Sequence, residues 1–230
     1  MIALENLPRI ITAVGGLGTA AFGLVESTKV FWGGVNHIGF KGIRTAVTPL
    51  TPSATAPGQP LNALSQQKIL ATLQANWFNG TDLASQKAIA KSLIKLNLNA
   101  ASAPALAAAT GVDPNALATV ADSIAKGTAL TPTQSDVYSR FDLIVTALLD
   151  QAYQRSDQTY RNGTKAWAMV FSLLLALGGG FVLNNGNPWA RADIVEVLLV
   201  GFLATPLAPI AKDLATALET AVNTLQLVKK

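Results

Sequence analysis

Cysteine is absent from the 230 residues of this chain, and charged residues are scarce. The lack of thiols excludes disulfide bonds, thiol catalysis, iron–sulfur clusters and cysteine-ligated zinc. Asp, Glu, Lys and Arg make up 13% of the sequence, whereas a typical soluble domain has about 25%. Half of the residues are hydrophobic, and the mean hydropathy is +0.36. Because so few charges cannot cover a water-exposed surface, the composition indicates a membrane protein.

Side chains that carry chemistry are also few. His37 is the only histidine, so it cannot build a zinc site from this chain alone, and no G-x-S-x-G or similar nucleophile motif surrounds it. The basic residues do not form a stripe, and the formal net charge is only +4, which argues against a nucleic-acid partner. We therefore expect no enzymatic activity, no catalytic or metal-binding residue, no cofactor and no small-molecule substrate.

Three long apolar windows occupy residues 10–32, 166–183 and 194–211. A spanning helix needs about 20 mostly apolar residues, and the second window has eighteen residues without a charge. The first window lacks the basic segment and the cleavage site of a signal peptide. These features predict an all-α integral membrane protein with three transmembrane helices and a soluble helical domain inserted between the first and the second.

The residues between the first two windows have a different character. Segment 48–60 has four prolines and no charge, which is typical of a linker. Apolar residues then recur at helical spacing, and Asp113-Pro114 and Thr131-Pro132 are helix-start signals. No segment favours a strand, so the inserted domain is expected to hold four or five helices.

We divide the chain into four parts. They are an N-terminal transmembrane helix with its juxtamembrane segment (1–47), the linker (48–60), the helical domain (61–160) and a transmembrane hairpin with an amphipathic tail (161–230). The last domain helix is expected to run on into the second window with a bend at Gly163, and the third window is expected to continue into the tail with kinks at Pro206 and Pro209.

Charged residues of the helical domain are expected to lie on solvated faces. Lys87, Lys91 and Lys95 face away from the apolar positions of their segment. The acidic residues of the last domain helix do not have the spacing of a calcium-binding loop, and we expect a solvated row of Asp136, Asp142, Asp150 and Asp157.

The orientation follows from lysine and arginine near the ends of the windows. Basic residues follow the first window, precede the second and follow the third, whereas the loop between the second and third has only Arg191. This distribution predicts an N-terminus outside, the helical domain and the C-terminus in the cytoplasm, and an outer loop at 184–193. The simple topology and the lack of cysteine suggest the inner membrane of a bacterium.

Glycines in the first window allow two interpretations. Residues 16–21 read "GLGTAA" and match a dinucleotide-binding fingerprint, but neither a ribose-binding acid about 20 residues further on nor a second strand is present. In a membrane helix, small residues four apart let a second helix approach closely. We therefore predict a helix-packing face of Gly15, Thr19 and Gly23, and a similar role for Gly178, Gly179 and Gly180.

Charged residues inside or beside the windows need partners or water. Glu26 and Lys212 lie toward the same predicted end of their helices, as do Arg9 and Glu196. We predict structural pairs such as Glu26 with Lys212, Asp213 with Lys29, and Arg9 with Glu196 or Asp193. A proton or ion relay is the alternative, but a relay needs a chain of titratable groups.

The expected function is a non-catalytic structural or accessory subunit that anchors, organises or stabilises a larger membrane protein assembly. Its expected partners are other membrane subunits or further copies of itself, together with the lipid bilayer. Two alternatives remain open. One is an oligomeric pore or transport component, and the other is a membrane subunit that binds haem or chlorin at His37, beside small and aromatic neighbours that suit a flat ring.

Overall fold

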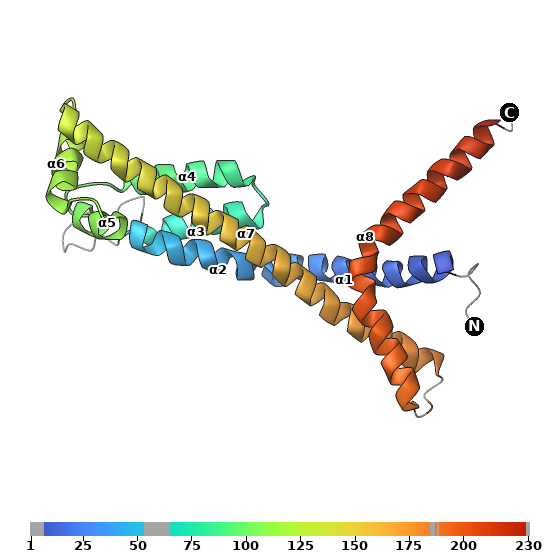
Figure 1. The fold of residues 1–230 in the computed structure, drawn as a ribbon. Coiled ribbons are helices and arrows are strands. Elements are labelled where there is room, and N and C mark those ends of the chain that lie inside the picture. The colour runs from blue at the N-terminus through green and yellow to red at the C-terminus, as the bar shows by residue number, and fades with distance from the viewer. Residues whose placement is uncertain (1–6, 53–64, 185–186, 188, 229–230) are drawn as a thin grey trace. The chain divides into compact units, whose positions relative to one another are not determined.

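The computed structural model describes residues 7–52, 65–184, 187 and 189–228, and side chains are described for most of these. Within this part of the chain all regular structure is helical, which confirms the all-α prediction (Figure 1). The elements are α1 (Leu7–Trp32), α2 (Asn36–Val47), the short 3-10 helix η2 (Thr48–Leu50), α3 (Gln66–Phe78), α4 (Leu83–Leu96), α5 (Ala103–Thr110), α6 (Pro114–Ala125), α7 (Pro132–Leu183) and α8 (Arg191–Val228).

The chain forms two compact units. One consists of Met1–Val35 with Arg161–Lys230, and we name it the membrane unit. The other is Asn36–Tyr160, and we name it the helical unit. The helix α7 belongs to both, because it continues without a break through Gly163. The predicted bend at Gly163 therefore does not interrupt the helix.

In the part of the chain that the structure describes, three helices are long and apolar enough to cross a membrane: α1, α7 and the first part of α8. At about 1.5 Å per residue, the 52 residues of α7 extend far beyond the ~30 Å hydrocarbon core of a bilayer. The uncharged stretch 166–183 is the part of α7 that suits the membrane. The chain is therefore a multi-pass membrane protein by the length and composition of its helices.

The glycine-rich segment of α1 is helical throughout. A dinucleotide-binding fingerprint requires a strand before its glycine turn, and here the residues before Gly16 continue the same helix. The nucleotide interpretation of "GLGTAA" is thus wrong.

Proline residues do not end α8. Pro206 and Pro209 both lie inside this helix, and Figure 1 shows that α8 changes direction partway along its length. Proline removes a backbone hydrogen bond and crowds the preceding turn, which is the usual cause of such a change. Beyond Ile210 the structure describes the helical backbone of the predicted tail and the side chain of Asp213.

The helical unit has one apolar core. Two aspartates cap helices of this unit: Asp82 accepts a hydrogen bond from Ser85 N at 2.9 Å, and Asp113, at an expected helix start, accepts one from Ala116 N at 2.7 Å. The fully buried residues come from every helix of the unit, and the largest are Ile43, Leu50, Ile69, Leu73, Ile94, Leu106, Leu117, Phe141, Leu149 and Tyr153. Phe141, Val145, Leu149 and Tyr153 recur every four residues, so one stripe of α7 forms a side of the core.

Two segments before the expected domain start belong to this core. Phe40, Ile43 and Val47 of α2 are buried, although the sequence suggested only a juxtamembrane segment there. The expected linker begins with η2, whose Leu50 is buried, and Gln66 Nε2 donates to the carbonyls of Thr48 and Thr51. The rest of that linker, residues 53–64, lies outside the described residues.

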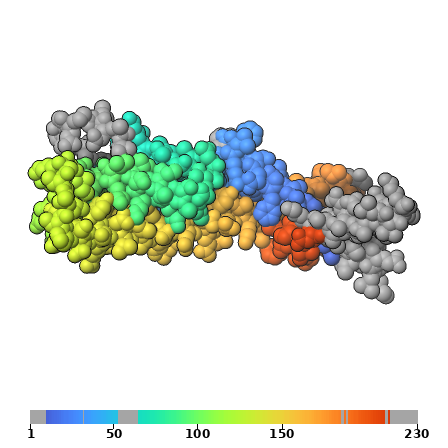
Figure 2. Space-filling model, turned by 90° about the horizontal axis from the view of Figure 1, so that it is seen from above, coloured from blue at the N-terminus to red at the C-terminus, as the bar shows by residue number. Residues whose placement is uncertain are grey.

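The expected solvated faces of α4 and α7 instead face one another. Lys87 Nζ lies 2.5 Å from Asp150, and Lys91 and Lys95 lie 2.6 and 2.9 Å from the two oxygens of Asp142. Figure 2 shows the surface of α4, in green, lying along that of the first half of α7, in yellow. The sequence interpretation was wrong for these pairs because helical periodicity separates core from non-core faces but does not show which non-core faces meet.

The ion pair at Asp142 changes its titration. Burial works to raise the pKa of the Asp142 carboxyl, but the hydrogen bonds from Lys91 and Lys95 outweigh burial and hold this pKa below its ordinary value of 3.8. Lys95 also lies over the ring of Tyr138, with its Nζ 4.9 Å from the ring centroid. The row of charges therefore fixes α4 against α7.

Candidate functional site

In the membrane unit, α1 packs against α8 through small residues. Gly15, Gly18, Ala21 and Val25 are buried along one side of α1, and their spacing of three or four residues keeps them on one helix face. A β-carbon added at Gly18 would overlap the backbone carbonyl of Ala204 and lie 3.1 Å from the β-carbon of Ala208. The two backbones therefore approach closely, which is how small residues promote helix association in membranes.

The predicted packing face of α1 is only partly buried. Gly15 is buried, whereas Thr19 and Gly23 are exposed. Gly16, Thr19, Ala20 and Gly23 together form an exposed face of small residues, and a β-carbon added at Gly16 or Gly23 would meet nothing within 4 Å. The Thr19 hydroxyl donates to the Gly15 carbonyl at 3.0 Å, so this face presents no unsatisfied hydroxyl.

A buried polar junction joins α7 to α8. The Ser172 hydroxyl lies 2.7 Å from the Gly201 carbonyl and 3.3 Å from the Thr205 hydroxyl. A β-carbon at Gly201 would lie 2.9 Å from the Cα of Leu173, so the two helices are close at this level. In the bilayer core, polar groups of spanning helices have to form their hydrogen bonds within the protein. The hydrogen bonds of the Ser172 hydroxyl to α8 are of this kind.

The three consecutive glycines of α7, Gly178, Gly179 and Gly180, differ in their surroundings. A β-carbon at Gly180 would lie 2.9 Å from Val197 and 3.1 Å from the ring of Trp189. At Gly178 and Gly179 it would meet nothing within 4 Å. Gly180 thus lies at the contact between α7 and α8, and its two neighbours lie on an open face.

The charged residues of the membrane unit are placed as follows. Glu26 forms an ion pair with Lys29, one helical turn along α1, at 2.6 Å, and its suggested pair with Lys212 stays a prediction. Glu196 and Asp213 are exposed, and Asp193 accepts a hydrogen bond from Ala190 N at 3.0 Å. The side chains of Arg9 and Lys212 lie outside the described residues.

Large apolar side chains are exposed on the spanning helices. They include Val182 and Leu183 on α7, which are 72% and 85% exposed, and Leu199 and Phe202 on α8, which are 56% and 55% exposed. An apolar hollow of about 460 Å³ lies between α7 and α8 and is lined by Leu173, Val195, Leu198, Leu199, Phe202 and Leu203. Such surfaces face lipid or another protein.

His37 belongs to the helical unit, at the start of α2. Its ring is exposed and meets the edge of the Phe78 ring, with the ring centroids 4.8 Å apart. Trp77, which precedes Phe78 in α3, donates its indole N–H to the Asn36 carbonyl at 3.0 Å. Among the described residues, no group of three or more His, Asp or Glu residues is placed to hold a metal ion. A haem or chlorin at His37 stays a prediction.

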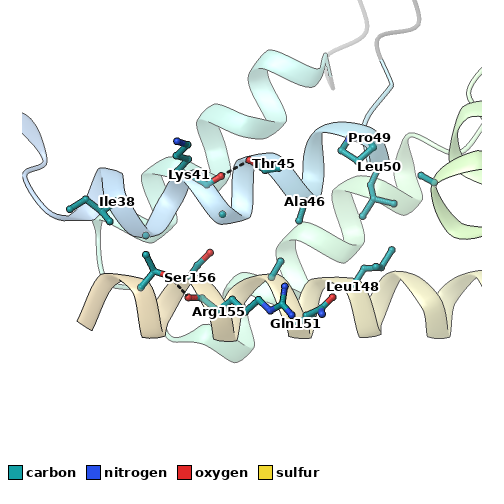
Figure 3. Close-up of a pocket in the computed structure, with 15 residues that line it drawn as sticks. Ile38, Lys41, Thr45, Ala46, Pro49, Leu50, Leu148, Gln151, Arg155 and Ser156 are labelled. Atoms are coloured by element: carbon teal, nitrogen blue, oxygen red, sulfur yellow. Dashed lines mark hydrogen bonds between the residues drawn. The ribbon is translucent and has the colours of Figure 1, made fainter. Parts of the chain in front are cut away.

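The helical unit also contains a pocket that the sequence did not indicate. It has a volume of about 590 Å³ and lies between α2 and α7 (Figure 3). Apolar residues such as Ile38, Leu50 and Leu148 line much of it, together with the cations Lys41 and Arg155. Periodicity could not reveal it, because the pocket exists only where these two helices meet.

No protein-family model matches this chain, and no curated protein or solved structure is significantly similar to it.

Proposed function

We propose that this chain is a non-catalytic accessory subunit that anchors or organises a larger membrane protein assembly. The observation that carries the proposal is the open small-residue face of α1. Gly16 and Gly23 lie on an exposed face of α1, away from the contact that Gly18 makes with α8. A β-carbon added at either position would meet nothing within 4 Å. A second helix could therefore approach the α1 backbone closely along this face.

The partner of this face is a helix from another subunit or from a second copy of the chain. The opposite face of α1, with Gly18, already packs against α8. The exposed apolar residues of α7 and α8 support the same proposal, because a helix of a larger assembly would cover part of them. The helical unit, with its own apolar core, would supply a second contact surface outside the bilayer.

We also propose an orientation for the spanning helices. The N-terminus and the 184–193 loop lie outside, and the helical unit and the C-terminus lie in the cytoplasm of a bacterial inner membrane. Lys41, Arg44, Arg155, Arg161 and Lys165 support this orientation, because they flank the first two candidate spans on the proposed inner side.

The accessory-subunit proposal is tested by purification in a gentle detergent followed by identification of the co-purifying chains. We expect the wild-type protein to elute as a complex with other chains or with itself. In the double variant Gly16→Leu/Gly23→Leu, the bulky side chains should block close approach, and the partner should be lost. The matched control Gly16→Ala/Gly23→Ala keeps the face small and should retain the partner.

Elution of the wild-type chain alone, as a monomer, would contradict the proposal. Equal recovery of the partner with the leucine and the alanine variants would show that the α1 face is not its binding surface. The fold of each variant is checked by circular dichroism, and all should remain helical because the substituted positions have free space around them.

A further inference from the structure

The pocket between α2 and α7 has the composition of a site for an amphiphilic anion. None of the fifteen residues that line it, all of which the structure describes, is acidic. Lys41 and Arg155 supply positive charge, and the Gln151 amide supplies further donors. Most of the other lining residues are apolar, so the pocket offers an apolar surface beside a cationic edge.

One residue that lines the pocket, Ser156, has a buried hydroxyl without a hydrogen-bond partner among the described residues. The Ser156 side chain lies on the side of α7 that faces α2 (Figure 3), and the residue is only 2% exposed. Its hydroxyl oxygen has no hydrogen-bond partner among the described residues. By contrast, the neighbouring Thr45 and Thr159 donate to carbonyls of their own helices at 2.9 and 2.8 Å. A buried polar group without a partner costs free energy, and a bound anion would accept its proton.

Glycine makes this arrangement possible. A β-carbon at Gly42 would lie 2.5 Å from the Ser156 hydroxyl oxygen. The absence of a side chain at Gly42 therefore lets α2 approach α7 at Ser156, and both residues are among those that line the pocket.

The position of the pocket in the sequence favours a lipid as the ligand. Its lining begins with Ile38, shortly after the first candidate span, and ends with Thr159, shortly before the uncharged stretch of α7. Residues 33–50 contain no acidic residue, and Lys41 of the pocket lies among them. Basic residues that closely follow or precede a spanning helix on its cytoplasmic side attract the headgroups of anionic lipids.

We propose that the α2–α7 pocket binds an anionic phospholipid, with its phosphate at Arg155 and Ser156 and its apolar part on the Ile38, Leu50 and Leu148 side of the pocket. Arg155 supplies a planar pair of donors for the phosphate, and Ser156 supplies a third. Lys41 extends away from α7 in Figure 3, and its flexible stem lets the amino group turn toward the ligand. This site is independent of the helix-packing face of α1.

The test is titration calorimetry of the full chain in a neutral detergent. The probes are a short-chain phosphatidylglycerol, a phosphatidylcholine with the same chains, inorganic phosphate and octanoate. We expect phosphatidylglycerol to bind about tenfold or more tightly than each of the other three. Arg155→Gln and Ser156→Ala should each weaken it by about tenfold, since each removes a hydrogen bond to a charged group.

Two control variants separate the pocket from general surface charge. Arg44→Gln removes a nearby exposed charge that does not line the pocket, and Arg140→Gln removes one from the same helix further away. Both should bind phosphatidylglycerol within about twofold of the wild type. Ser156→Ala deletes a buried hydroxyl that has no partner in the fold, so its thermal midpoint should not fall, and a loss of binding would not reflect unfolding.

Several results would overturn the proposal. Equal binding of phosphatidylglycerol and phosphatidylcholine would remove the requirement for an anion, and phosphate alone binding as well as the lipid would remove the role of the apolar surface. Octanoate binding as tightly as phosphatidylglycerol would identify a free fatty acid as the ligand instead. Equal weakening by Arg140→Gln would show unspecific attraction. None of these results depends on a partner subunit, so they leave the accessory-subunit proposal untouched.

Discussion

Single glycines decide how closely the helices of the membrane unit can pack. Gly18 and Gly16 are two residues apart in α1, yet their surroundings are opposite. A β-carbon at Gly18 would overlap the Ala204 carbonyl, whereas one at Gly16 would meet nothing within 4 Å. The two positions share the same helix and the same helix propensity, so a comparison of them isolates the packing contribution.

Substitution of Gly18 by valine should destabilise the contact between α1 and α8. The new side chain must push two backbones apart, and overpacking of this kind costs about 1–3 kcal/mol. The measurement is the thermal unfolding midpoint in a detergent that separates the chain from its partners, and Gly16→Val is the control that adds the same side chain where the chain by itself leaves open space. Similar midpoints for the two variants would show that Gly18 does not lie in a tight contact.

At the scale of elements, the charged row between α4 and α7 fixes two helices whose sequences gave no sign of pairing. Lys91 and Lys95 share the carboxylate of Asp142, and Lys87 pairs with Asp150. The side chain of Asp142 is 25% exposed, so water screens its interactions less than those of an open surface pair. A network of this kind contributes more than isolated surface pairs do.

Replacement of Asp142 by asparagine should lower the stability of the helical unit by about 1 kcal/mol at neutral pH, because it leaves two lysines without their shared carboxylate. The midpoint of thermal unfolding, followed by circular dichroism, gives the measurement. Asp136→Asn is the matched control, since Asp136 is exposed on the same helix. A smaller effect at high salt is expected because ions screen the pairs.

The same substitution predicts a pH dependence. The pKa of Asp142 is lower in the folded protein than its ordinary value of 3.8, so its contribution to stability is complete above that value and is lost as the pH falls through the folded pKa. The difference between wild type and Asp142→Asn should therefore be constant near neutral pH and shrink in acid. A difference that grows in acid would contradict the assignment.

At the scale of the whole molecule, three candidate spans leave two possible orientations, and the distribution of basic residues favours one of them. The chain has no cysteine, so single cysteines can be introduced without a background. Ser135→Cys lies in the helical unit and Asn187→Cys lies in the loop between the second and third spans, and both positions are exposed.

Labelling with a membrane-impermeant thiol reagent should reach these two cysteines from opposite sides. In sealed inside-out vesicles, position 135 should react and position 187 should react only after the membrane is opened. In intact spheroplasts the pattern should reverse. Labelling of both positions from one side would contradict the three-span topology.

The local features of the fold were accessible from the sequence because they depend on neighbours in the chain. Asp113-Pro114 and Thr131-Pro132 mark helix starts that the structure confirms, since α6 begins at Pro114 and α7 at Pro132. Helix α2 was not predicted as part of the core. Its apolar residues Phe40, Ile43 and Val47 form a short stripe among glycines and basic residues, and only packing against distant segments shows that the stripe is buried.

By itself, the sequence determined the class of this protein: all-α, poor in charge, with three helices that suit a membrane. Composition and periodicity suffice for this because hydrophobic burial acts on each segment separately. The tertiary structure alone decided which face of α1 meets α8, which lysines meet Asp142 and Asp150, and where α2 approaches Ser156. These are contacts between residues far apart in the chain, and their geometry depends on how helices pack, which a pattern along one helix does not contain.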